Sequence, residues 1–158
     1  MSSRFIHYHF KNYKDKGINI TYRGKEVKYK QSTNLDTSKL GEYEYVYQYS
    51  INDKIHYTKR YITVVDTTKP ELILKGDINT ILDYSQEYNE DGYTSIDSYD
   101  GELTDKVKSE IVKEKNSENY KIKYSVKDLS NNETIVYRNI IYKDLTPPEI
   151  KLKRNINS

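Results

Sequence analysis

The segment best suited to binding an ion is an acidic turn in which carboxylates recur at short intervals. It contains Asp97, Asp100, Glu102 and Asp105 around Gly101. Ca²⁺ takes about six to eight oxygen ligands, often from closely spaced carboxylates, so these four acidic residues are candidate calcium ligands. The same sequence also suits an ordinary turn, in which Asp97 and Asp100 accept bonds from backbone amides and Gly101 takes a positive φ. Both interpretations remain open at the level of sequence.

No other group of residues in the sequence has the spacing of a metal or catalytic site. His7 and His9 would share one face of a strand, which suits a transition metal, but no third ligand is near them in the sequence. Surface histidines are the better interpretation. The sequence contains no Cys, which excludes disulfides, thiolate metal sites and cysteine nucleophiles. Its Asp and Glu residues show no sign of a paired-carboxylate cleft, and common catalytic motifs are missing, so we expect no enzyme and no cofactor beyond the calcium considered above.

The charge balance and hydropathy exclude several classes of partner. Lys and Arg number 26 and Asp and Glu number 24, and the interspersed charges give a net charge of +2. Neither a nucleic acid nor an anionic membrane is therefore an expected partner. No apolar run reaches the length of a membrane span, about 18 residues, so we expect no membrane insertion. Residues 1–30 lack the apolar core of a signal peptide.

The amino-acid composition favours β-structure. The chain has 18 Tyr, many Ile, Val and Thr, and no Ala, so good strand formers are abundant and the best helix former is missing. Tyr buries a large ring and keeps a polar tip, so it can close a thin core at low hydropathy. We therefore predict an all-β protein.

Alternation of apolar and polar residues locates the strands. In Tyr120–Val126 every second residue is apolar, and Tyr43–Tyr49 repeats the pattern with four Tyr, as half-buried strands do. A polar turn and a return strand follow each, over Tyr57–Val65 and Thr134–Lys143, and residues 27–35 and 103–113 supply weaker strands. This is the pattern of an immunoglobulin-like sandwich, in which a tyrosine near the start of the penultimate strand often bonds back to the backbone. Tyr43 and Tyr120 lie where such a tyrosine corner would be, or are plain core aromatics.

The chain contains an internal repeat. The pattern D-x-T-x-P-E-(apolar) occurs at 66–72 and again at 144–150, an offset of 144 − 66 = 78. It divides the chain into a degenerate repeat over 1–66, which shows no counterpart of the opening strand, a typical repeat over 67–144, and the start of a third repeat or a tail over 145–158. Proline stiffens the linkers between them. Asp66 and Asp144, at the junctions, could extend a calcium site.

Residues 70–148 resemble the bacterial Ig-like domain named after a pesticidal crystal protein, a relative of the hyalin repeat. That family has P-x-I-x-L-x-G, Y-x-D-x-G, an acidic D-x-x-D-G-D-L-T turn, a tyrosine- and valine-rich strand ending in D-x-x-G-N, and a closing D-x-x-P-P. The chain has P-E-L-I-L-K-G at 70–76, Y-N-E-D-G at 88–92, D-S-Y-D-G-E-L-T at 97–104, Y-K-I-K-Y-S-V-K-D-L-S-N at 120–131 and P-P at 147–148. Repeat one has Y-R-G-K at 22–25 in place of the acidic turn. The resemblance implies tandem immunoglobulin-like β-sandwiches.

The resemblance also implies a role. Such modules stand in arrays on secreted and cell-wall-associated proteins of Gram-positive bacteria, so the expected place is extracellular. We predict a non-catalytic spacer or stalk whose partners are neighbouring Ig-like repeats. The alternative is an adhesion or polysaccharide-binding accessory module of a cell-wall or carbohydrate-active enzyme, such as a polysaccharide deacetylase. Its ligand would be cell-wall polysaccharide or a host surface molecule, bound by exposed aromatic residues among Tyr49, Tyr57, Tyr61 and Tyr99.

Overall fold

The structure is a computed structural model that describes residues 3–8, 13–113 and 115–151. The chain divides into two compact units, Met1–Thr68 and Lys69–Ser158. Among the described residues, strands account for nearly all regular structure, and the one helical element is a single 3₁₀ turn, Thr104–Lys106. The prediction of an all-β protein is therefore confirmed.

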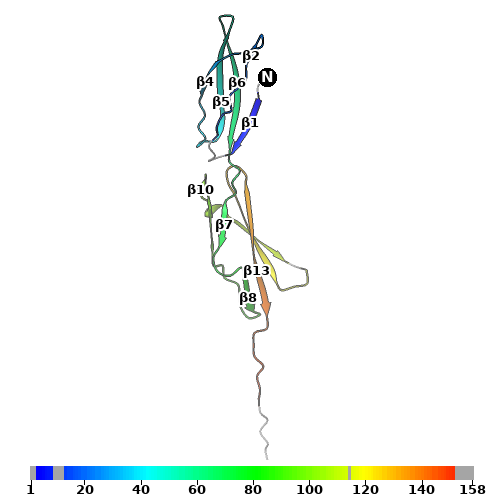
Figure 1. The fold of residues 1–158 in the computed structure, drawn as a ribbon. Helices are drawn as coiled ribbons and strands as arrows, with labels where there is room; N and C mark the ends of the chain where they lie inside the picture. The colour runs from blue at the N-terminus through cyan, green and yellow to red at the C-terminus, as the bar shows by residue number, and fades with distance from the viewer. Residues whose placement is uncertain (1–2, 9–12, 114, 152–158) are drawn as a thin grey trace, which may run out of the picture. The chain divides into compact units, whose positions relative to one another are not determined.

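The second unit is a sandwich of two sheets. One sheet has the strand order β10-β9-β7, and the other has the order β11-β12-β13-β8 (Figure 1). The strand β8 runs parallel to β13, whereas the other pairs are antiparallel. The strands are β7 (Glu71–Leu74), β8 (Asn79–Asp83), β9 (Tyr93–Asp97), β10 (Gly101–Glu102), β11 (Lys108–Lys113), β12 (Tyr120–Lys127) and β13 (Glu133–Lys143).

The core of the second unit follows from the alternation in β12. Ile122, Tyr124 and Val126 are buried, the residues between them are half-buried, and Lys121 and Lys127 on either side are exposed. Side chains from the opposite sheet and its connection cover this row, among them Leu72 and Leu103. A strand with one apolar face is stable only when a second layer covers that face, and the short sheet β10-β9-β7 supplies the layer.

The first unit has one larger sheet, with the strand order β1-β6-β5-β4, and a separate hairpin of β2 and β3. Its buried core is Tyr45, Tyr47 and Ile62. Tyr45 and Tyr47 come from the predicted tyrosine-rich strand, so the aromatic rings supply most of the apolar surface of a small core. The strands are β1 (Ser3–Tyr8), β2 (Thr21–Tyr22), β3 (Lys25–Glu26), β4 (Tyr29–Thr33), β5 (Gly41–Ile51) and β6 (Lys54–Val65).

The two tyrosines at the expected corner positions differ. The Tyr43 hydroxyl donates a hydrogen bond to the backbone carbonyl of Lys39, four residues upstream, over 2.9 Å. This is the geometry of a tyrosine corner. Tyr120 instead packs its ring against Tyr142, with ring centroids 6.4 Å apart, as a partly buried member of the core.

Candidate functional site

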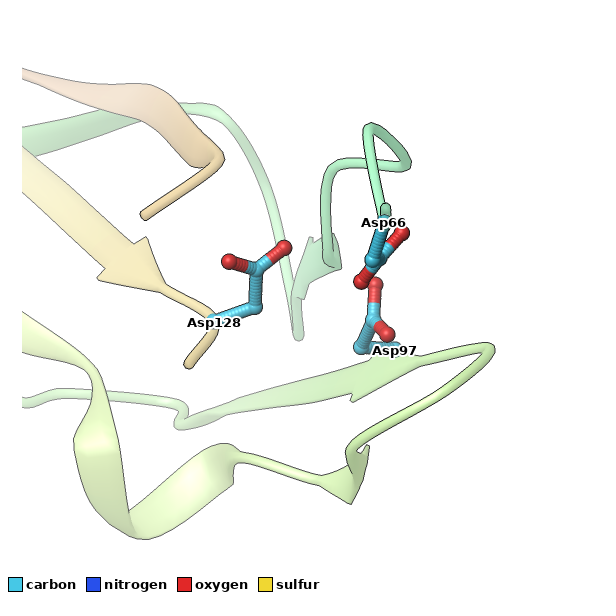
Figure 2. Close-up of side chains that lie close together, drawn as sticks. All are labelled: Asp66, Asp97 and Asp128. Atoms are coloured by element: carbon cyan, nitrogen blue, oxygen red, sulfur yellow. The ribbon is translucent and has the colours of Figure 1, made fainter. Parts of the chain in front are cut away.

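Two buried aspartates lie close together at strand ends of the second unit. Asp97 is the last residue of β9, and Asp128 directly follows β12. One carboxylate oxygen of each lies within 4.8 Å of one of the other (Figure 2). A third buried aspartate, Asp66 of the first unit, directly follows β6. Their exposed fractions are 3% for Asp97, 5% for Asp128 and 5% for Asp66. Aspartate is rarely buried to this extent without a compensating partner.

Local turns hold the two aspartates of the second unit. The amide N–H groups of Tyr99 and Asp100 donate to Asp97 Oδ1 over 2.7 and 3.0 Å. The amide N–H of Asn132 donates to Asp128 Oδ1 over 2.8 Å, and its side-chain Nδ2 donates to Asp128 Oδ2 over 2.7 Å. Asp is suited to such turns because its short side chain reaches amides a few residues ahead. Each turn therefore fixes the direction of its carboxylate.

One oxygen of this pair has no hydrogen-bond partner. Asp97 Oδ2 is buried, and no donor among the described residues reaches it. Neither Asp97 nor Asp128 forms an ion pair with a described Lys or Arg. Buried polar atoms are nearly always satisfied, so an orphaned carboxylate oxygen beside a second carboxylate requires an explanation. Chemically, the pair can bind a hard cation.

The other predicted calcium ligands bond elsewhere. Asp100 Oδ2 accepts from the Leu129 amide N–H over 2.7 Å, which ties the acidic turn to the turn after β12. Glu102 Oε1 accepts from the Thr104 amide N–H over 3.0 Å, and hydrogen bonds from Thr104 hold the pKa of Glu102 below its usual value. Asp105 is exposed in the 3₁₀ turn. Of the four predicted ligands, only Asp97 lies close to Asp128.

Asp128 was not among the predicted ligands, although the sequence holds a signal for it. Asp128 follows β12 without an intervening residue, as Asp66 follows β6, and Asp97 ends β9. An acidic residue placed at the end of a core strand lies at the rim of a sandwich, where it can meet acids from other strand ends. The turn interpretation for Gly101 agrees with the structure, because this glycine has a φ of +75°.

The remaining candidates are peripheral or lie outside the described residues. His9 is not described, nor is the side chain of His7, and His56 is exposed and stacks on Tyr49 with centroids 5.5 Å apart. Of the four tyrosines considered for sugar stacking, Tyr57 has an exposed fraction of 61%, and Tyr61 and Tyr99 of 41% and 37%. Tyr49 is half-buried.

A groove of about 400 Å³ in the second unit adds a candidate that the sequence did not indicate. Its lining includes Tyr84, Tyr120 and Tyr142 together with Gln86 and Glu118. Tyr84 has an exposed fraction of 62% and its ring stacks on that of Tyr142, with centroids 6.1 Å apart. Stacked rings with polar neighbours in a groove can receive a ligand that has both apolar faces and hydroxyl groups.

A second buried polar cluster in this unit is structural. Arg138 is fully buried and donates to Asp91 over 3.0 Å and to the backbone carbonyl of Lys75. The Tyr124 hydroxyl donates to Glu90, which also receives the Gly92 amide N–H. Burial alone would raise the pKa of Glu90, but these hydrogen bonds and the charge of Arg138 hold it below its usual value. The arrangement neutralises a buried cation and leaves no reactive group facing a cleft.

The first unit contains an equivalent cluster. Arg60 pairs with Asp15 and donates to the Gly17 carbonyl over 2.9 Å. The Tyr47 hydroxyl donates to Asp15 over 2.7 Å, and the Gly17 amide N–H donates to the same carboxylate over 2.7 Å. Burial alone would raise the pKa of Asp15, but the bonds from Tyr47 and Gly17 and the charge of Arg60 lower it. In each unit, therefore, a buried tyrosine hydroxyl and a glycine amide donate to one carboxylate that also pairs with an arginine, and in the second unit a further acid, Asp91, pairs with that arginine.

The family comparison gives a match within the second unit. Residues 72–141 match the model of a family described as a bacterial surface protein, Ig-like domain. Over these residues the second unit is similar to the Ig-like domains of bacterial surface proteins. This agrees with its two-sheet sandwich, and the sequence resemblance is thereby supported at the level of bacterial Ig-like domains. No helix in the described ranges is long and apolar enough to cross a membrane.

Comparison with solved structures gives distant similarities, and a search of curated proteins finds no significant match. A lipoprotein from Bacteroides thetaiotaomicron is similar over 52% of this chain and 41% of its own, with 20% identity and a TM-score of 0.42. The M60 catalytic domain with the CBM51-1 and CBM51-2 domains of Clostridium perfringens ZmpB is similar over 91% of this chain and 30% of its own, with 12% identity and a TM-score of 0.48. The chain therefore spans less than half the length of either protein.

Proposed function

We propose that the chain is a tandem pair of Ig-like modules that serves as a non-catalytic spacer in a bacterial surface protein. The observation that carries the proposal is the recurrence of the buried arginine cluster in both units. Tyr47 and Tyr124 are separated by 124 − 47 = 77 residues, and Arg60 and Arg138 by 138 − 60 = 78. These offsets agree with the sequence repeat at 66–72 and 144–150.

Strand pairing supports the same interpretation. In the first unit Tyr45 pairs with Arg60 across β5 and β6, and in the second Ile122 pairs with Arg138 across β12 and β13. The sheet order β1-β6-β5-β4 corresponds to β8-β13-β12-β11, with β1 and β8 both parallel to their neighbours. The hairpin of β2 and β3 corresponds to β9 and β10.

A spacer needs modules that keep their own cores and do not merge. Each unit has its own core cluster, and a short segment containing Pro70 leads into the second. Proline restricts the backbone of such a segment and of the residue before it. In repeat proteins each module contacts mainly its neighbours, so length grows with the number of modules.

Small-angle X-ray scattering of the full chain tests the spacer role. A compact globule of this length would have a radius of gyration of about 15 Å, and a spacer should exceed that value clearly. Inserting a flexible Gly-Ser segment after Thr68 should broaden the distance distribution, because it replaces a restricted connection with a flexible one. A radius of gyration near the compact value would contradict the proposal.

The second candidate function is polysaccharide binding, and the tyrosine-lined groove favours it. Sugars stack on exposed aromatic faces, and Tyr84 presents such a face beside Tyr142. Affinity electrophoresis in gels containing bacterial cell-wall polysaccharide tests this function. Tyr84→Ala should abolish any retardation, whereas Tyr137→Ala, which removes an exposed tyrosine outside the groove, should leave it unchanged. A wild-type chain that migrates identically with and without polysaccharide would contradict it.

A further inference from the structure

We propose that Asp97 and Asp128 of the second unit bind a calcium ion. The two carboxylates come from different sheets of the sandwich, since Asp97 ends β9 and Asp128 follows β12. An oxygen of each lies within 4.8 Å of an oxygen of the other. Two ligands of one Ca²⁺, each at about 2.3–2.6 Å from the ion, are separated by such a distance or less.

The unbonded oxygen of Asp97 is an independent observation that points to a ligand. Asp97 has an exposed fraction of 3%, and its Oδ2 has no donor among the described residues, whereas its Oδ1 receives two amide N–H groups. The turn therefore satisfies one oxygen of Asp97 and leaves the other buried without a donor, in a carboxylate that lies close to that of Asp128. A turn that served only the backbone would not require the second oxygen to be buried.

Charge supports the same conclusion. Asp128 has an exposed fraction of 5%, so both carboxylates are largely removed from water. No described Lys or Arg forms an ion pair with either of them, so the like charges repel each other in an environment that screens poorly. A divalent cation bound between the two carboxylates would replace this repulsion with attraction of both carboxylates to the cation.

The donor set selects the class of ion. The described ligands are carboxylate oxygens, with no Cys in the sequence and no His in the group, so a soft metal or one that prefers imidazole is disfavoured. Ca²⁺ accepts irregular oxygen coordination completed by backbone carbonyls and water, whereas Mg²⁺ demands a near-ideal octahedron. A site assembled from turns of two sheets fits the tolerant ion better.

The first unit offers an internal control. With the repeat offsets, Asp97 corresponds to Tyr22 (97 − 75 = 22) and Asp128 to Ile51 (128 − 77 = 51). Neither residue can bind a cation through a carboxylate. Calcium should therefore act on amides of the second unit and leave those of β5 unchanged.

Thermal unfolding and hydrogen–deuterium exchange of the full chain, first treated with EDTA, test the proposal. At about 10 mM CaCl₂ and a dissociation constant of about 1 mM, the Tm of the second unit should rise by roughly 6–11 °C. Exchange should slow in peptides that cover residues 97–101 and 128–132, and not in peptides of β5. NaCl at matched ionic strength should produce neither effect.

Two variants complete the test. Asp97→Asn keeps the Oδ1 acceptor of the turn, so it should fold, lose the calcium-dependent rise and be at least as stable as the wild type in EDTA, because the repulsion is removed. Asp105→Asn, in the same loop but exposed, should keep the full rise. A wild-type chain whose Tm and exchange do not respond to CaCl₂, or that responds equally to NaCl, would overturn the proposal. So would an Asp97→Asn variant that keeps the rise. If that variant does not fold, the exchange pattern of the wild type decides.

Discussion

Replacing the central tyrosine of each buried cluster with phenylalanine should destabilise the two units unequally. Tyr47 and Tyr124 are both fully buried and each donates to a carboxylate, Asp15 and Glu90 respectively. Phenylalanine fills the same space, so the change removes a hydrogen bond to a charged acceptor and little packing. Such bonds contribute about 1.5–3 kcal/mol to the free energy of unfolding.

The exposure of the acceptor decides where in that range each variant falls. The Asp15 side chain has an exposed fraction of 2%, so water cannot replace the lost hydroxyl, and Tyr47→Phe should cost about 3 kcal/mol. The Glu90 side chain has an exposed fraction of 36%, so water compensates in part, and Tyr124→Phe should cost about 1.5 kcal/mol. The first unit should therefore be the more sensitive.

Urea unfolding followed by hydrogen–deuterium exchange resolves the two units. With a slope of about 1 kcal/mol/M for units of this size, the midpoint of the first unit should fall by roughly 3 M, or the unit should unfold outright, in Tyr47→Phe. The midpoint of the second unit should fall by roughly 1.5 M in Tyr124→Phe. Tyr137→Phe, at an exposed position, is the control and should shift neither midpoint. Equal shifts in the two units, or a larger shift in the second, would refute the reasoning from acceptor burial.

Three further outcomes are expected. The folded-state pKa of Glu90 lies below its unfolded value, so the stability that ionised Glu90 contributes is complete above about pH 4.3 and is lost as the pH falls through the folded pKa. In a plot of Tm against pH, Glu90→Gln should therefore flatten the decline at acid pH. Gly76→Ala should destabilise more than Gly101→Ala in thermal unfolding. Both glycines have a positive φ, but a Cβ added at Gly76 would collide with the Asp91 carboxylate, whereas a Cβ added at Gly101 would meet no atom within 4 Å. Tyr43→Phe removes the bond to the carbonyl four residues upstream and should lower the stability of the first unit by about 1 kcal/mol in urea unfolding. Similar losses for the two glycines, an unchanged decline at acid pH, or a neutral Tyr43 variant would each contradict the corresponding argument.

The strands were predictable because local alternation encodes which side of a strand is buried. Tyr120–Val126 and Tyr43–Tyr49 were expected as half-buried strands, and they form the centres of β12 and β5. The return strands were also expected and appear as β13 and β6. The pattern was weaker at 103–113, and there the structure has a 3₁₀ turn before β11, whose residues are all exposed. Where no side of a strand is buried, alternation carries little information.

The candidate site was predictable only in part. Asp97 was found because it belongs to a dense acidic turn, but its nearest acids in sequence bond to amides elsewhere, as Asp100 does to Leu129. Asp128 was missed because it lies 128 − 97 = 31 residues away, in a turn with its own local explanation. Sequence spacing indicates which carboxylates share a loop. It does not indicate which carboxylate oxygens are left without a hydrogen bond after the backbone amides of that loop have found their acceptors.

The sequence by itself determined the class of fold, the position of the main strands and the period of the repeat, because these depend on residue type and on spacing within a few turns of chain. Only the tertiary structure decided which acids meet. The ends of β9 and β12 lie in different sheets, and they approach each other because the two sheets share the core that contains Leu72 and Tyr124. That approach results from packing many apolar side chains at once, so no local pattern records it. The burial of Asp97 and Asp128 follows from the sandwich as a whole.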